Sequence, residues 1–69
     1  MKLITHLSNI RKSNGLTQAQ LAEKTGVSRK TINTIENSVF VPSTVLALKL
    51  AAALEVSVHD LFELPPSSA

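Results

Sequence analysis

The segment from residue 17 to residue 37, TQAQLAEKTGVSRKTINTIEN, contains the signals of two short helices joined by a tight turn. Thr17 and Gln20 have the spacing of a capping box, in which two side chains satisfy the first free amides of a helix. Gly26 can take the left-handed backbone that ends this helix, and Ser28 can cap the next helix two residues later. The segment therefore predicts two helices that cross at about 90–120°.

The side chains of these two helices divide into an apolar set and a polar set. Ala22 is small enough for the helices to approach closely, and the angle between them is filled by Leu21, Val27, Ile32 and Ile35. The outer face of the second helix carries Arg29, Lys30, Asn33 and Thr34. These side chains offer hydrogen-bond donors and acceptors without bulky apolar groups, as contact with base edges in duplex DNA requires.

The flanking sequence predicts three further helices and no strand. Leu3, Leu7 and Ile10 recur at helical spacing, and Gly15 follows as a stop signal. Ser43 can cap another helix, whose core face is expected to contain Ala47, Leu48, Leu50, Ala51 and Leu54.

A short last helix is expected to begin at Ser57, with Asp60 at its third position, and Leu61 and Phe62 are expected to close the core. The fold class is therefore an all-α, compact five-helix domain over residues 1–64. Residues 65–69, PPSSA, are expected to be a flexible tail or the start of a linker.

Size and composition exclude several classes of protein. The chain has 69 residues and no Cys, so one domain is expected, without disulfides or Cys-ligated zinc. His6 and His59 have no metal-binding spacing, and two Gly residues cannot make a glycine-rich phosphate loop. The apolar run at residues 45–54 is too short for a bilayer, and no signal peptide is recognisable. We therefore expect a cytoplasmic protein that is not an enzyme and needs no cofactor, metal or membrane.

The charge of the chain is divided between its two halves. Residues 1–30 hold six basic residues and one acidic residue, a net charge of +5, whereas residues 31–69 have a net charge of −3. A basic half and an acidic half indicate that one face meets a polyanion. Apolar residues make up 43% of the chain, which indicates an apolar patch available for a partner.

Four motifs together resemble the Cro/CI-type repressors of the XRE family: LTQxxLA at residues 16–22, GVSRxTI at 26–32, IE at 35–36 and PS at 42–43. The resemblance implies a lambda-repressor-like domain whose helix-turn-helix motif, residues 17–37, places its second helix in the major groove. It implies a homodimer on an imperfectly palindromic duplex, with Arg29, Lys30 and Thr34 reading bases and Asn33 beside them on the same face.

The resemblance also assigns supporting residues. Its phosphate-contacting positions match Gln18, Ser28, Thr31 and Asn37. The resemblance also brings Arg11 and Glu36 together as an ion pair. This pair is expected to brace the second helix of the motif, which is called the recognition helix. The family commonly has Gly where this chain has Ser38 and Glu55, and polar or basic residues at 39–41, where this chain is apolar.

The apolar residues after the motif predict a dimer patch made of Val39, Phe40, Val41, Val45 and Leu46. The alternative is that Phe40 folds back onto the core of its own domain. Residues 41–62 also resemble a bacterial subgroup that carries a molybdate-binding-protein-like sensor, which implies a fused or separate sensor domain. Both an excised module and a free-standing regulator fit this resemblance.

The function expected from these features is sequence-specific binding of double-stranded DNA by a transcriptional repressor. The alternative is an antitoxin-type protein-binding module that also binds its own operator. An RNA-binding helical domain fits less well, because the chain has few aromatic side chains on which unpaired bases could stack.

Overall fold

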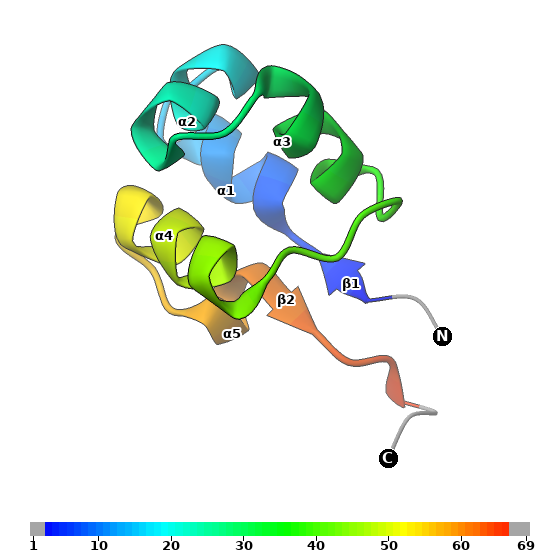
Figure 1. The fold of residues 1–69 in the computed structure, drawn as a ribbon. Helices are drawn as coiled ribbons and strands as arrows, with labels where there is room; N and C mark the ends of the chain where they lie inside the picture. Colours follow the sequence, from blue (N-terminus) through cyan, green and yellow to red (C-terminus); the bar gives the residue numbers. More distant parts are fainter. Residues whose placement is uncertain (1–2, 67–69) are drawn as a thin grey trace.

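The computed structural model describes residues 3–66 (Figure 1). Five helices and two very short strands follow one another along this part of the chain. In order they are β1 (Ile4–Thr5), α1 (Leu7–Ser13), α2 (Gln18–Thr25), α3 (Arg29–Glu36), α4 (Thr44–Leu54), α5 (Val58–Leu61) and β2 (Phe62–Glu63). The predicted helical fold class is confirmed. The expected tail lies partly outside the described residues, since these end at 66.

The helix boundaries are set by local capping interactions. Thr17 and Gln20 form the predicted capping box of α2, and Gly26 ends this helix with a φ of 73°. Ser28 and Ser43 each accept the backbone N–H three residues on, at the beginning of α3 and α4. Each cap satisfies amide groups that the helix itself leaves without a partner, so these boundaries follow from a few neighbouring residues.

The two strands correct the expectation of a chain without strands. β1 and β2 pair antiparallel, with Ile4 opposite Glu63 and Thr5 opposite Phe62. Leu3 therefore lies outside α1, although its spacing fits that helix. The backbone before α1 is held by a contact distant in sequence, since the N–H of His6 donates to the carbonyl of Leu61 at 2.7 Å.

The core lies where α1, α2, α3, α4 and α5 converge. Its buried apolar residues are Leu7, Leu21, Ala22, Ile32, Ile35, Leu50, Ala51, Leu54, Leu61 and Phe62. Leu48, predicted to be in the core, is instead 57% exposed. Each residue turns an α-helix by about 100°, which takes Leu48 away from the face that contains Leu50, Ala51 and Leu54.

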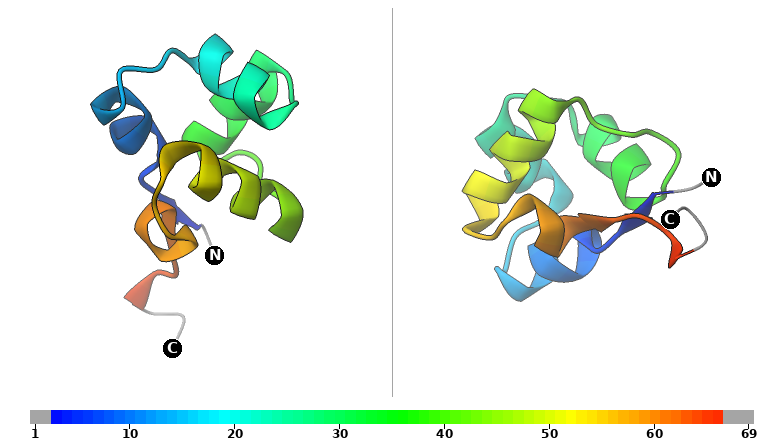
Figure 2. Two further views of the ribbon diagram at one scale, coloured as in Figure 1. Left: turned by 90° about the vertical axis from the view of Figure 1, so that its left-hand side faces the viewer. Right: turned by 90° about the horizontal axis from the view of Figure 1, so that it is seen from below.

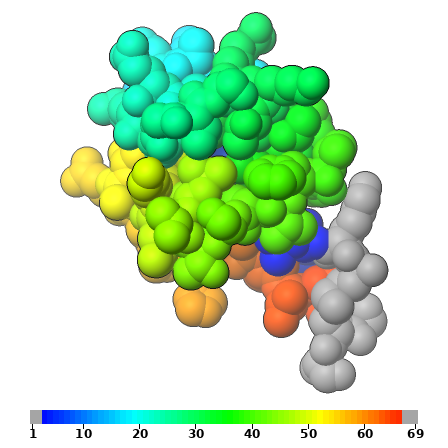
Figure 3. All heavy atoms as spheres, viewed as in Figure 1, coloured from blue at the N-terminus to red at the C-terminus, as the bar shows by residue number. Residues whose placement is uncertain are grey.

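The arrangement of the helices separates two ends of the molecule. α2 and α3 lie together at one end, and α5 and β2 lie at the other (Figures 1 and 2). Figure 3 shows that the segment after α3 and the beginning of α4 share one continuous face. Among the helices of residues 3–66, none has both the length and the apolar character needed to cross a membrane.

Candidate nucleic-acid interface

The outer face of α3 is polar and accessible because its inner face is fully used by the core. Ile32 and Ile35 are buried, whereas Arg29, Lys30 and Asn33 are exposed. Within residues 3–66 neither Arg29 nor Lys30 is held by an ion pair. Both cations lie in the first turn of α3, directly after the Ser28 cap, and are available to an incoming anion.

The four predicted base-reading residues lie on this face in different surroundings. Arg29, Lys30 and Asn33 border one shallow hollow together with Gln18 of α2. Thr34 is half-buried one turn further along, and its hydroxyl donates to the carbonyl of Thr31 at 2.9 Å. The hollow therefore brings three of the four together, while Thr34 borders a second hollow with Val39 and Phe40.

The predicted phosphate-contacting residues within α3 and at its two caps also have roles within the protein. The Ser28 hydroxyl accepts the backbone N–H of Thr31 at 3.1 Å and lies 3.0 Å from the Thr31 hydroxyl. The Asn37 side chain donates to Asn33 Oδ1 at 3.2 Å. Ser28 and Asn37 are nevertheless exposed, so each retains atoms that face solvent.

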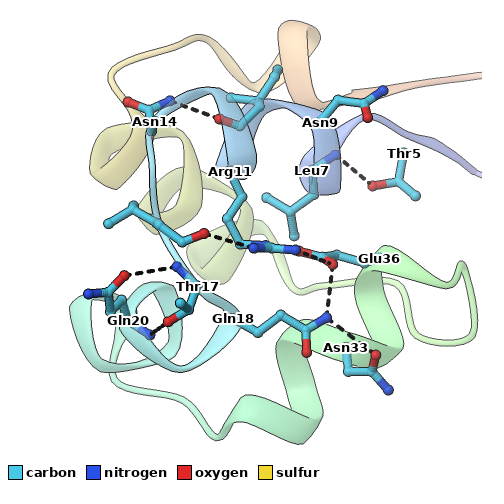
Figure 4. A network of polar contacts seen from close by, with 12 residues as sticks. Thr5, Leu7, Asn9, Arg11, Asn14, Thr17, Gln18, Gln20, Asn33 and Glu36 are labelled. Atoms are coloured by element: carbon cyan, nitrogen blue, oxygen red, sulfur yellow. Dashed lines mark hydrogen bonds and ion pairs between the residues drawn. The ribbon is translucent and has the colours of Figure 1, made fainter.

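Arg11 and Glu36 form an ion pair that joins α1 to the end of α3 (Figure 4). Arg11 Nε donates to Glu36 Oε2 at 2.6 Å, and the second guanidinium contact, to Oε1, is 3.3 Å long. The Arg11 and Glu36 side chains are only 9% and 6% exposed. Arg11 also donates to the carbonyl of Leu16 at 2.7 Å. The pair fixes the last turn of α3 against the body of the domain.

Gln18 extends this network to the outer face of α3. The sequence did not predict this extension. Its Nε2 donates to Glu36 Oε1 at 2.9 Å and to Asn33 Oδ1 at 3.3 Å (Figure 4). The partners lie 15 and 18 residues away on a different helix, so no spacing within the sequence signals the contact. A phosphate contact through this amide nitrogen would require one of these hydrogen bonds to break.

Two residues other than glycine adopt left-handed backbone, one in the loop after α3 and one after α4. Ser38 has a φ of 60° and Glu55, after α4, has a φ of 57°. The N–H groups of Val39 and Phe40 both donate to the carbonyl of Thr34, which holds the loop against α3. A side chain in this backbone region costs roughly 1–2 kcal/mol.

The residues of the predicted dimer patch are mostly exposed. Val39 is 77% and Phe40 is 47% exposed, so Phe40 does not fold into the core of its own domain. Val41 and Val45 are also exposed, whereas Leu46 is half-buried and packs against the core. Val41 borders an apolar groove that is also lined by Leu48 and Phe62.

The ends of the domain differ in charge. The first turn of α3 carries Arg29 and Lys30, while Asp60 and Glu63 lie on α5 and β2 at the opposite end. Two hydrogen bonds with Ser57 hold the pKa of Asp60 below its ordinary value. The larger effect comes from the backbone N–H of Ser57, and the smaller effect comes from the Ser57 hydroxyl. The first turn of α3 and the end formed by α5 and β2 thus carry opposite charges.

Two helices joined by a tight turn, the second with a polar outer face, define a helix-turn-helix domain. The chain belongs to the helix-turn-helix family HTH_3, whose profile matches residues 7–61. It is 43% identical over 60 residues to an HTH-type transcriptional regulator of Methanothermobacter thermautotrophicus, a match that covers 86% of this chain and 87% of the relative. It is 36% identical over 61 residues to the phage CTXphi transcriptional repressor RstR of Vibrio cholerae, covering 88% and 54% of the two chains.

Solved structures show the same similarity. The restriction-modification controller protein C.AhdI of Aeromonas hydrophila has a TM-score of 0.74 and 33% identity, covering 78% of this chain and 82% of that one. SinR, a master regulator of biofilm formation that was solved in complex with DNA, has a TM-score of 0.72 and 37% identity, covering 77% and 86%. The predicted family is thus confirmed, and it is a family of DNA-binding transcriptional regulators rather than of enzymes. These relatives give no support for a fused sensor.

Proposed function

We propose that this chain represses transcription by binding a specific duplex DNA sequence with α3 in the major groove. The observation that carries the proposal is the outer face of α3, where two cations and an amide lie free of the core on a helix braced by a buried ion pair. RstR is named a transcriptional repressor, and SinR was solved with DNA, which supports this assignment. The relatives are regulators, so the antitoxin-type alternative is not favoured.

Arg29 is the side chain best suited to read a base. Its planar guanidinium can donate two parallel hydrogen bonds to O6 and N7 of guanine, which discriminates against other bases by about 1–3 kcal/mol. Lys30, Asn33 and Thr34 supply further donors and acceptors along the same face. Phosphate contacts are assigned to Ser28, Thr31 and Asn37, and to Gln18 through its backbone N–H in the first turn of α2.

The proposed active form is a homodimer that uses the exposed apolar residues after α3. The proposed patch consists of Val39, Phe40, Val41 and Val45, which are exposed, and of Leu46, which is half-buried at its inner edge. Two domains related by a two-fold axis would place their recognition helices about one turn of DNA apart, roughly 34 Å. The preferred duplex is accordingly an imperfect palindrome.

Selection of bound duplexes from a random pool, followed by sequencing, tests the proposed function. The wild type is expected to enrich a palindromic motif, and Arg29→Ala to lose the preference for one base pair in each half-site. Lys49→Ala is the matched control, because Lys49 is an exposed cation of α4 beside the far end of α2. Failure of the wild type to enrich any sequence would refute the proposed function, and an unchanged motif in Arg29→Ala would refute the role of that side chain.

A further inference from the structure

The Glu36 carboxylate determines which end of the Gln18 amide faces outward. An ionised carboxylate can only accept hydrogen bonds, so the group of Gln18 that faces Glu36 must be the NH₂ group. Its two hydrogens are both used, one by Glu36 Oε1 and one by Asn33 Oδ1. The Gln18 carbonyl oxygen therefore points away from Glu36, as Figure 4 shows.

The orientation of Asn33 is fixed in the same way. Its Oδ1 accepts from both Gln18 Nε2 and Asn37 Nδ2, so its own NH₂ group is turned outward. Within residues 3–66 no hydrogen bond engages Gln18 Oε1. Beside the hollow that Arg29 and Lys30 also border, the protein thus presents a free acceptor on Gln18 and a free donor on Asn33.

We infer that the side chain of Gln18 recognises DNA as a hydrogen-bond acceptor, by binding the exocyclic amino group of adenine or cytosine, with Glu36 as the positioning residue. The inference rests on the proposed function and adds a base preference to it. Phosphate oxygens are acceptors and cannot bind this carbonyl, whereas N6 of adenine and N4 of cytosine are donors in the major groove. One strand position of each half-site should therefore favour adenine or cytosine over guanine or thymine.

The test compares duplex selection by the wild type, Gln18→Ala and Glu36→Gln, each at a temperature where circular dichroism shows the variant folded. Gln18→Ala should remove the preference at that single position and weaken binding to the best wild-type site by about fivefold. In Glu36→Gln the amide that replaces the carboxylate can also donate, so residue 36 no longer fixes the Gln18 amide, and only the longer contact with Asn33 Oδ1 favours the wild-type orientation. Guanine and thymine should therefore become more acceptable at that position. Asn9→Ala, which removes an exposed amide from α1, is the control and should leave the motif unchanged.

The outcomes separate this inference from the proposed function. An enriched wild-type motif that persists unchanged in Gln18→Ala, with all sequences weakened alike, would overturn the inference and leave the proposed function in place. A loss of preference in Gln18→Ala without any broadening in Glu36→Gln would overturn the positioning role of Glu36. Absence of an enriched wild-type motif would overturn both the inference and the proposed function.

Discussion

Removal of Glu36 should destabilise this domain more than removal of any exposed acidic residue. The Arg11–Glu36 pair is almost fully buried, and its carboxylate accepts three hydrogen bonds, two from Arg11 and one from Gln18. Glu36→Ala leaves the Arg11 cation buried with only the carbonyl of Leu16 as a partner. Stranding a buried charge typically costs about 3–5 kcal/mol.

This cost is large compared with the total stability of so short a chain. A stability of about 0.05–0.15 kcal/mol per residue gives 69 residues a free energy of unfolding of roughly 3–10 kcal/mol. At about 4–8 °C per kcal/mol, the melting temperature of Glu36→Ala should fall by more than 10 °C, and the variant is expected to be close to unfolding at 37 °C.

Urea denaturation followed by circular dichroism measures the effect, with Glu63→Ala as the matched control. Glu63 pairs with His6 at 2.9 Å, but its side chain is 56% exposed, and such pairs contribute at most about 1 kcal/mol. The double variant Arg11→Met/Glu36→Leu removes both charges and should be more stable than Glu36→Ala. Equal losses of stability in Glu36→Ala and Glu63→Ala would refute the reasoning. So would a double variant whose loss equals the sum of the losses measured for Arg11→Met and Glu36→Leu separately.

Three further predictions concern the rest of the domain. Phe40→Ser should weaken self-association, which sedimentation at micromolar to millimolar concentrations measures. A wild type that stays monomeric at all these concentrations would contradict the proposed role of the patch in dimerisation. Ser38→Gly and Glu55→Gly should each stabilise the fold by up to about 1 kcal/mol in urea denaturation, because Gly tolerates the left-handed backbone, and no gain at either site would contradict the strain. Asp60 should titrate below its ordinary pKa of 3.8 in carboxyl NMR spectra. The stabilising contact with Ser57 is therefore present above pH 3.8 and is lost as the pH falls through the lower pKa of the folded state. Ser57→Ala should raise the titration midpoint of Asp60 toward its ordinary value.

Features that depend on a few neighbouring residues could be predicted from the sequence. The capping box at Thr17, the serine caps and the left-handed Gly26 involve groups at most four residues apart. Their hydrogen bonds form in the same way wherever the helix packs, so a short sequence pattern is sufficient to locate them. The helix-turn-helix motif consists largely of such features, and it was therefore recognisable.

Features that depend on distant partners could not be predicted in this way. The β1–β2 pairing joins residues 57 to 59 positions apart, and nothing near Ile4 indicates that its backbone partner is Glu63. The same is true of Gln18, whose surroundings are set by Glu36 on another helix. Leu48 was assigned to the core by its chemistry alone, although its angular position on α4 turns it to solvent.

The apolar loop after α3 changes how the proposed DNA complex must obtain its affinity. Lys and Arg side chains that neutralise phosphates give salt-dependent affinity for any sequence, and the family commonly places polar or basic residues where this chain has Val39, Phe40 and Val41. Arg11, although basic, is buried against Glu36 and cannot reach a phosphate. In the proposed complex the phosphate contacts of one domain are therefore made mostly by uncharged groups. Joining two domains through the apolar residues makes the second contact with DNA intramolecular, so affinity rises without additional cations, and the base contacts of α3 and Gln18 make up a larger share of the total.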